Sequence, residues 1–451
     1  MRPLRVAVLD EELPYPLTSG KRIRSFNLLR RLAEWHRITL LCHRNPDRDE
    51  VASAETVFRQ LGIETIVVDR SIPPKSGPGF YARLAGNLFS PLPYSVATHA
   101  SPELTQAARA FAAENAVDVW HCEWTPYAAV LRDALATSLP KARWVVMAHN
   151  VESLIWQRYS ETESNRLKRW YARRQWRKFA RFEQWAYSAA STAVAVSSDD
   201  ATVMLEQFGV MGAKVVDNGV DTAYFRPQRD VERNPAQILY LGSLDWRPNL
   251  DAVQLLLNKI FPQVRAQVPT ASLVVVGRHP PEWLRAQVAD TPGAELFADV
   301  PDVRPFLATS GMLAVPLRIG GGSRLKILEA LATATPVIST LVGAEGLNLS
   351  PDRDLIVTGQ WEGMADAIIH GIRHPEDLQE TGESGRRTVL AQYDWQPLAE
   401  RLDGIWRAIA SKSTRTVVEN HRMSEEALLP SVVRENLTVH HSTADRSRER
   451  K

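Results

Sequence analysis

A run of three glycines between an apolar strand and a basic helix constrains this chain more than any other feature. The run, Gly320–Gly322, lies in the stretch AVPLRIGGGSRLKILEALATATPVISTLVGAEG, residues 314–346. Glycine adopts backbone conformations closed to other residues and lets a ligand lie against the main chain. Ser323 is predicted to cap the following helix. Such a helix start, with Arg324 and Lys326 in its first turn, favours a diphosphate. An ordinary glycine-rich loop would give the same run of glycines.

The rest of the chain alternates apolar runs of strand length with segments of helical spacing. Near-continuous apolar runs are typical of parallel strands that are buried on both faces. The alternation therefore predicts an α/β fold with doubly wound sheets, whose ligands bind at the carboxyl ends of the strands. The runs are Leu4–Leu9, Ile38–Cys42, Thr65–Val68, Val117–His121, Trp144–Ala148, Thr192–Ser197 and, in a second series, the strands that begin near Gln237, at Leu273 and at Pro336.

Length and composition exclude several classes of protein. The chain has 451 residues, enough for two or three domains, and its net charge of +2 does not indicate nucleic-acid binding. Its two cysteines, Cys42 and Cys122, form no metal-ligand pattern, and no metal site is predicted. The N-terminus lacks the pattern of a signal peptide, and no window is long and apolar enough for a transmembrane helix. We therefore expect a cytoplasmic protein.

Three segments together resemble the retaining glycosyltransferases of the GT-B fold, in particular the bacterial polysaccharide members of family four. They are VVDNGVDTAYFRP at 215–227, GGGSRLKILEAL from Gly320, and the strand after that helix. Glu329 matches the second of two family glutamates, which holds the ribose of the nucleotide. Gly321 stands in the place of the first, which contacts the transferred sugar.

The resemblance implies two Rossmann-like domains that face a cleft. It places the acceptor-side domain at 1–217, a hinge at 218–235, the nucleotide-sugar domain at 236–394 and a helix crossing back to the first domain at 395–410. Residues 411–451 are polar and highly charged, which predicts a disordered tail.

The implied reaction is transfer of a sugar from a nucleotide-diphosphate sugar to a hydroxyl of a glycan or lipid-linked acceptor. It would proceed with retention, in polysaccharide biosynthesis, without a cofactor or an obligatory metal. Arg324 and Lys326 would stabilise the leaving diphosphate, and His149, at the end of a strand, would steady the donor sugar. A GT-B pseudoenzyme or scaffold, favoured by Gly321, and a sugar-nucleotide epimerase of similar fold are the alternatives.

Further residues follow predicted strands or loops that line the donor site in this family. His121, Glu123 and Trp124 suit contacts to carbohydrate, and packing would explain them as well. A plain turn would equally explain Gly20. The predicted donor-binding residues are Gly20, Gly242, Arg247, Gly321, Gly322, Ser323, Glu329, Gly343 and Glu345.

A strongly basic and aromatic segment occupies residues 166–185. On a helix, its apolar residues Phe179 and Phe182, with Ala186 and Ala189 beyond, fall on one face that would pack on the domain. The cationic and aromatic remainder would then meet an anionic membrane surface, which predicts peripheral attachment. A solvated basic helix is the alternative.

Overall fold

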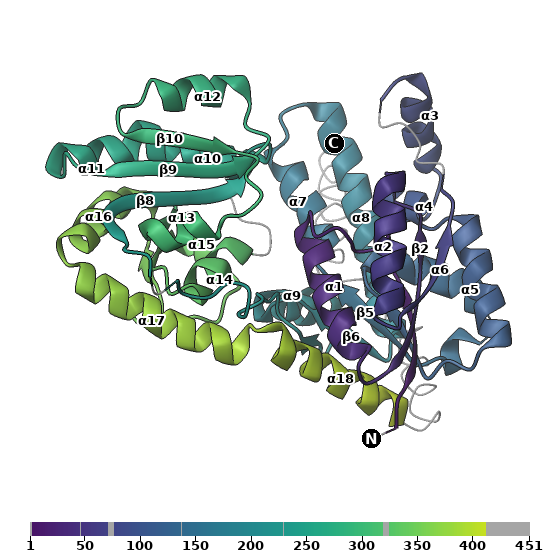
Figure 1. The fold of residues 1–451 in the computed structure, drawn as a ribbon. Helices are drawn as coiled ribbons and strands as arrows, with labels where there is room; N and C mark the ends of the chain where they lie inside the picture. The colour runs from purple at the N-terminus through teal and green to yellow at the C-terminus, as the bar shows by residue number, and fades with distance from the viewer. Residues whose placement is uncertain are drawn as a thin grey trace, which may run out of the picture. The chain divides into compact units, whose positions relative to one another are not determined.

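The computed structural model describes residues 2–45, 47–70, 76–136, 138–228, 230–318 and 324–411. They form two compact units, both drawn in Figure 1. The first unit comprises the described chain up to Asp217 and again from Ala399, and the second is Asn218–Leu398. The segment predicted as a hinge, 218–235, therefore belongs to the second unit. The predicted tail lies outside the described residues except for Ser411.

The described part of the first unit contains a seven-stranded sheet in the order β3-β2-β1-β4-β5-β6-β7, and every strand pair in it is parallel. The order reverses between β1 and β4, and at such a point the carboxyl ends of neighbouring strands form a ligand site. The strands are β1 (Arg5–Leu9), β2 (Arg37–His43), β3 (Glu64–Val68), β4 (Val119–Cys122), β5 (Trp144–Ala148), β6 (Thr192–Ala195) and β7 (Lys214–Val215).

Helices join these strands. The first, α1, begins at Gly20 because Ser19 caps it: the Ser19 hydroxyl oxygen accepts the N–H of Arg22 at 3.2 Å. The described helices of this unit are α1 (Gly20–Leu32), α2 (Arg48–Gln60), α3 (Pro78–Asn87), α4 (Tyr94–His99), α5 (Pro102–Glu114), α6 (Ala128–Leu135), α7 (Glu152–Thr162), α8 (Arg166–Ala189), α9 (Ser198–Phe208) and, from Ala399, the rest of α18 (Trp395–Ser411).

The basic segment forms the long helix α8. Its predicted apolar face is confirmed, since Phe179, Phe182, Ala186 and Ala189 are all buried. Lys178, one of the basic residues of this segment, was expected on the cationic face, and this is wrong: the side chain is buried, and its ammonium group donates to the backbone carbonyl of Asn87. The last residue of α3, Asn87, lies against that side of α8, so the buried ammonium group has lost its hydrating water and needs an acceptor from the protein.

The second unit holds a parallel sheet in the order β10-β9-β8-β11-β12-β13. Its strands are β8 (Asn234–Ser243), β9 (Ser272–Arg278), β10 (Ala294–Ala298), β11 (Ser310–Val315), β12 (Val337–Thr340) and β13 (Ile356–Thr358). Its described helices include α10 (Arg247–Leu255), α11 (Phe261–Gln267), α12 (Glu282–Ala289), α13 (Arg304–Thr309), α14 (Leu325–Ala332), α15 (Leu341–Ala344), α16 (Met364–Arg373) and α17 (Pro375–Gln392). Two parallel doubly wound sheets confirm the predicted fold class.

Asp354 ties the loop before β13 to α17. Its carboxylate accepts the N–H of Ser350 at 3.0 Å, the hydroxyl of Ser384 at 3.1 Å and the guanidinium of Arg353 at 2.8 Å. Burial alone would raise the pKa of Asp354, but these hydrogen bonds lower it to about 2.

We expect Asp354→Ala to lower the free energy of unfolding by about 1 to 3 kcal/mol at neutral pH, because a buried N–H is left without an acceptor. The carboxylate is stabilising above its unfolded pKa of 3.8 and loses this effect as the pH falls towards about 2, so the difference from wild type should shrink in that range. Denaturant titrations at several pH values measure it. The control Arg353→Gln removes only an exposed partner and should cost less; an equal loss in both variants would contradict the role of the buried carboxylate.

Candidate functional site

The helix after the glycine run starts later than predicted. It begins at Leu325, and Arg324 occupies the N-cap position with a left-handed backbone at φ 51° and no side-chain cap. The prediction of Ser323 as N-cap is therefore wrong, because the helix begins at Leu325 and Arg324 takes the cap position. Gly321, Gly322 and Ser323 themselves lie outside the described residues.

Lys326 is held at the carboxyl end of β8. Its Nζ lies 3.0 Å from Oδ1 of Asn249, 3.4 Å from the hydroxyl of Tyr240 and 4.6 Å from the centre of the Tyr240 ring. The same Asn249 oxygen accepts the Tyr240 hydroxyl at 3.0 Å, and the Asn249 amide donates to the carbonyl of Ser243 at 2.9 Å. The ammonium group is thus fixed by residues from β8 and α10 that the sequence did not single out.

Gly242 makes room for this arrangement. A Cβ atom at Gly242 would lie 2.9 Å from Cγ of Asn249 and 3.0 Å from Nζ of Lys326. Such distances are shorter than real Cβ contacts allow, so a side chain here would displace Asn249 or the ammonium group. The sequence predicted Gly242 as a ligand contact, and the structure gives it a packing role beside the predicted cation.

Two groups on consecutive turns of α14 have pKa values near neutrality. Burial, with a smaller contribution from Arg324, lowers the pKa of Lys326 to about 7. Burial raises the pKa of Glu329 to about 7, against the attraction of Lys326. Both groups can therefore change charge when an anion or a hydroxyl group arrives, as groups in functional sites often do.

Arg324 and Glu345 face each other. Nη2 of Arg324 donates to the carbonyl of Val342 at 2.7 Å and lies 3.4 Å from the Glu345 carboxylate. The arginine is buried, and burial lowers its pKa, whereas the side chain of Glu345 is half exposed. These two residues, predicted separately, thus form one ion pair close to the start of α14.

Gly343 and Arg247 are two further predicted donor-binding residues. A Cβ atom at Gly343 would lie 2.3 Å from Oγ of Ser339 and 2.8 Å from the carbonyl of Val315, and the Gly343 N–H already donates to Thr340. Close packing therefore requires a glycine there. Arg247 is exposed at the start of α10, and its side chain makes no hydrogen bond or ion pair within the described ranges.

In the first unit, charged side chains gather where β1 and β4 end. Lys21, next to the predicted Gly20, places its Nζ 2.7 Å from Asp10 and 3.2 Å from Glu11. Burial is the largest influence on the pKa of Asp10 and raises it, against the attraction of Lys21. No prediction from the sequence included this group, although three acids, Asp10, Glu11 and Glu12, directly follow a predicted strand.

His149 does follow β5, and it lies beside Glu123. Its Nε2 is 3.3 Å from the Glu123 carboxylate, which also receives a hydrogen bond from His121 at 2.8 Å. His121 and Glu123 are buried, and the side chain of His149 is 13% exposed. Trp124 completes the group: its Nε1 donates to Glu152 at 3.1 Å, and Nζ of Lys21 lies 5.4 Å from its ring centre. The structure thus brings together the histidines and the acid that the sequence indicated separately.

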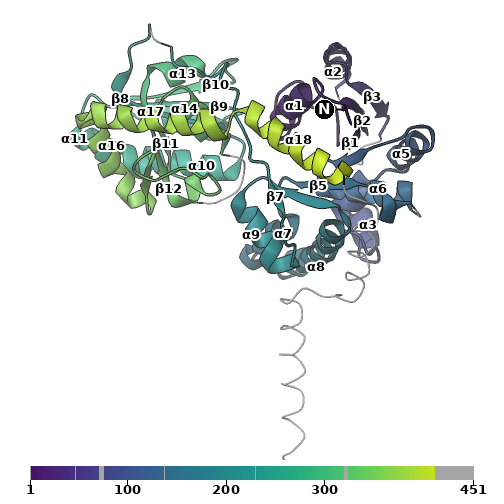
Figure 2. The same ribbon diagram turned by 90° about the horizontal axis from the view of Figure 1, so that it is seen from below.

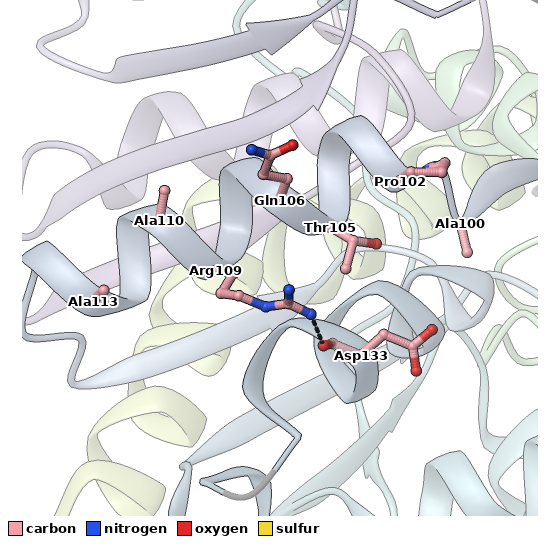
Figure 3. Close-up of a pocket in the computed structure, with 8 residues that line it drawn as sticks. All are labelled: Ala100, Pro102, Thr105, Gln106, Arg109, Ala110, Ala113 and Asp133. Atoms are coloured by element: carbon pink, nitrogen blue, oxygen red, sulfur yellow. Dashed lines mark hydrogen bonds between the residues drawn. The ribbon is translucent and has the colours of Figure 1, made fainter.

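The pocket of about 620 Å³ in Figure 3 is separate from both groups of charged side chains described above. It lies between α5 and α6, where Arg109 donates to the carbonyl of Asp133 at 2.7 Å. None of its lining residues is a predicted site residue. Within the described ranges, no three histidine, cysteine or acidic side chains are placed to hold a metal ion.

Comparison with known proteins gives two family matches. Residues 22–224 match a family described as "Glycosyltransferase Family 4", and residues 235–374 match "Glycosyl transferases group 1". Together these matches cover most of both units.

Curated relatives are similar over part of their length. The chain is 25% identical over 256 residues to an MMP alpha-(1->4)-mannosyltransferase of Mycolicibacterium hassiacum, over 54% of this chain and 61% of that protein. It is 28% identical over 207 residues to a GDP-mannose-dependent monoacylated alpha-(1-6)-phosphatidylinositol monomannoside mannosyltransferase of Corynebacterium glutamicum, over 42% of this chain and 54% of that protein.

Solved structures share the fold. Anabaena Alr3699/HepE, solved in complex with UDP, aligns with a TM-score of 0.63 at 12% identity, over 90% of this chain and 100% of that one. The two parallel sheets and this likeness identify the fold as GT-B, while the cleft predicted between the units stays a prediction. With both family matches lying on these two units, the chain belongs to glycosyltransferase family four.

Proposed function

We propose that this protein transfers a sugar from a nucleotide-diphosphate sugar to a hydroxyl of a glycan or lipid-linked acceptor, with retention at the anomeric carbon. The observation that carries the proposal is the ammonium group of Lys326, which Asn249 and Tyr240 hold at the carboxyl end of β8. Glu329 lies one turn further along the same helix, and in this proposal it binds the ribose.

The chemistry of the leaving group supports this assignment. Negative charge on the diphosphate grows as the sugar departs, and preorganised cations stabilise that charge because they need no rearrangement during the reaction. Lys326 and Arg324 supply the cations in this proposal, in place of a divalent ion. His149, from the first unit, steadies the donor sugar.

The names of the relatives suggest which donor substrates to test first. Two of them are mannosyltransferases, one of these is GDP-mannose-dependent by name, and HepE was solved with UDP. GDP-mannose and UDP-glucose are therefore the first donors to test, with lipid-linked sugars or oligosaccharides as acceptors. Binding without release of the nucleoside diphosphate, across the acceptor panel, would favour a pseudoenzyme instead.

Lys326 should make nucleotide binding depend on pH. With a pKa of about 7 this lysine is mostly neutral at pH 8, and a bound diphosphate favours its charged form. Binding of GDP or UDP at pH 8 should therefore take up about one proton, and the affinity should fall by up to about tenfold per pH unit above 7.

Calorimetry in two buffers of different ionisation enthalpy measures that proton. The uptake should disappear in Lys326→Gln and persist in the control Lys259→Gln, which changes an exposed lysine of the same unit. Proton uptake that survives in Lys326→Gln would exclude this lysine as the group that becomes charged.

Glu329 should recognise ribose hydroxyls. At pH 8 its carboxylate is mostly ionised and can accept hydrogen bonds from both hydroxyls. Glu329→Gln should then weaken a ribonucleoside diphosphate by about tenfold, the loss of a charge-assisted hydrogen bond, and a 2′,3′-dideoxy analogue much less. Calorimetric titration of both ligands into wild type, Glu329→Gln and the exposed control Glu362→Gln measures these affinities. An equal loss of affinity for the two ligands would show that Glu329 does not bind the ribose hydroxyls.

We also propose that the protein works at the cytoplasmic face of a membrane, attached peripherally through α8. No helix in the described residues has the length and apolar character needed to cross a bilayer. Figure 2 shows α7 beside α8. Leu167 and Trp170 on α8 are 73% and 46% exposed, and Ile155 and Tyr159 on α7 are 49% and 44% exposed. Exposed basic residues lie along the same helix α8, namely Arg166, Lys168, Arg173, Arg174, Arg177 and Arg181, and the guanidinium group of Arg174 lies 5.5 Å from the ring centre of Trp170. Such a surface suits anionic headgroups.

The protein should therefore sediment with anionic but not with neutral liposomes at low salt, and salt should release it. Replacing Arg173, Arg174 and Arg177 by glutamine should abolish sedimentation and leave nucleotide binding intact. The matched control removes three exposed charges elsewhere in the first unit, Arg37, Arg59 and Lys141, and should still sediment. Equal loss in both triple variants would mean that net charge, and not this helix, determines binding.

A further inference from the structure

Glu123 stands between two histidines at the carboxyl end of β4. The residue is only 2% exposed. Its Oε2 receives Nε2–H of His121 at 2.8 Å, and its Oε1 receives the hydroxyl of Ser25 at 2.8 Å. Nε2 of His149 lies 3.3 Å from that same Oε1. The carboxylate therefore faces three groups, only one of which has been given a role in the reaction.

The protonation of His121 follows from its other neighbour. Nε1 of Trp406, on α18, lies 3.2 Å from Nδ1 of His121. An indole N–H can only donate, so Nδ1 must accept and carries no proton. The proton of a neutral His121 is therefore on Nε2, where it points at Glu123, and the glutamate acts as acceptor.

The surroundings of Glu123 on balance favour its ionised form. Burial by itself opposes ionisation, but the hydrogen bond from His121 and the neighbouring His149 hold the pKa of Glu123 well below its ordinary value. Arg24, fully buried on α1, attracts the carboxylate, and Asp10, at the end of β1, repels it. Every oxygen of Glu123 is thus an acceptor, and a neighbouring ring nitrogen is favoured only if it carries a hydrogen.

This requirement falls on His149. The Glu123 oxygen 3.3 Å from Nε2 lies off the line of an N–H bond, so Nε2 has no hydrogen-bond partner within the described ranges, and no described residue forms a hydrogen bond with Nδ1 either. A lone pair on Nε2 would still lie beside the ionised carboxylate and be repelled by it, so the neutral ring keeps its hydrogen on Nε2 and its lone pair on Nδ1. We propose that Glu123 is a positioning residue that holds His149 in the tautomer with Nε2 protonated, so that Nδ1 accepts a hydrogen bond from a hydroxyl of the donor sugar. The second half of this proposal rests on the proposed function of His149, whereas the tautomer does not.

A purely structural Glu123 would do no more than satisfy buried neighbours. Its loss would then lower stability without altering the ring nitrogens of a folded His149. A positioning role predicts a change in the tautomer itself, and a fall in kcat greater than any rise in KM. These two readouts separate the two roles.

The experiment uses the full chain labelled with ¹⁵N-histidine, and Glu123→Gln as the variant. Long-range ¹H–¹⁵N correlation spectra distinguish protonated from unprotonated ring nitrogens, and the signals of His149 are assigned by their absence in His149→Asn. In wild type we expect one tautomer, with Nε2 protonated. In Glu123→Gln we expect a mixture, because the amide can present either an acceptor or a donor to the ring. In a transfer assay kcat should fall by about tenfold, the effect of one lost hydrogen bond, with KM for the donor within about twofold.

Asp403→Asn is a matched control. Nε2 of His36 lies 2.7 Å from the Asp403 carboxylate, so this variant makes the same chemical change beside a different buried histidine of the same unit. It should alter the signals of His36 and leave those of His149 unchanged. If Glu123→Gln does not fold, the wild-type spectrum still tests the tautomer of His149, and Glu123→Asp, which withdraws the carboxylate by one methylene, takes the place of the variant.

A wild-type His149 protonated on Nδ1, or an unchanged tautomer in Glu123→Gln, would overturn the proposal. The spectra need no turnover, so they remain decisive even if the protein transfers no sugar. Conversely, an absence of transfer together with the expected spectra would overturn only the proposed function.

Discussion

A charged group that is buried in a protein must find partners that replace the water it has lost, and both candidate sites depend on this requirement. In the second unit, Asn249 and Tyr240 surround the ammonium group of Lys326. In the first unit, two histidines and a serine surround the carboxylate of Glu123. The partners come from different strands and helices in each case, so the sheets must form before either charge is stable. Parallel sheets supply the means, because they bring the ends of strands distant in sequence to one edge.

Much of the fold could be predicted from the sequence because its signal is local. A strand buried on both faces must be apolar along its length, and the runs from Leu4 to Ala148 coincide with β1 to β5 to within two residues at each end. The apolar face of α8 could be predicted in the same way, because its apolar residues recur every three to four positions. The positions of the apolar runs and the family resemblance then placed His149 at the end of a strand and Lys326 in the first turn of a helix.

Features that depend on residues distant in the sequence could not be predicted in the same way. Lys178 belongs to a basic run, and nothing in that run shows that Asn87 lies against it. The helix α14 starts after Arg324, whose backbone is left-handed. An arginine does not favour that conformation, so the sequence did not indicate that the helix would begin two residues after Ser323. Lys21 and Asp10 went unnoticed because a salt bridge between a loop and a helix has no fixed spacing. The ligand contacts of Gly242 and Gly343 stay predictions, and the structure shows in addition that the close approach of neighbouring atoms leaves no room for a side chain at either position.

The last helix has a consequence for how the protein can be divided. Residues 399–411 of α18 belong to the first unit, and Trp406 within them is the partner that sets the protonation of His121. The first unit is therefore not one continuous piece of chain. Residues 2–217 alone lack Trp406, whose buried indole donates a hydrogen bond to His121. A hybrid that joins this first unit to the nucleotide domain of a relative would have to carry its own last helix with it, so the natural points of exchange in this chain are two, near residues 217 and 399.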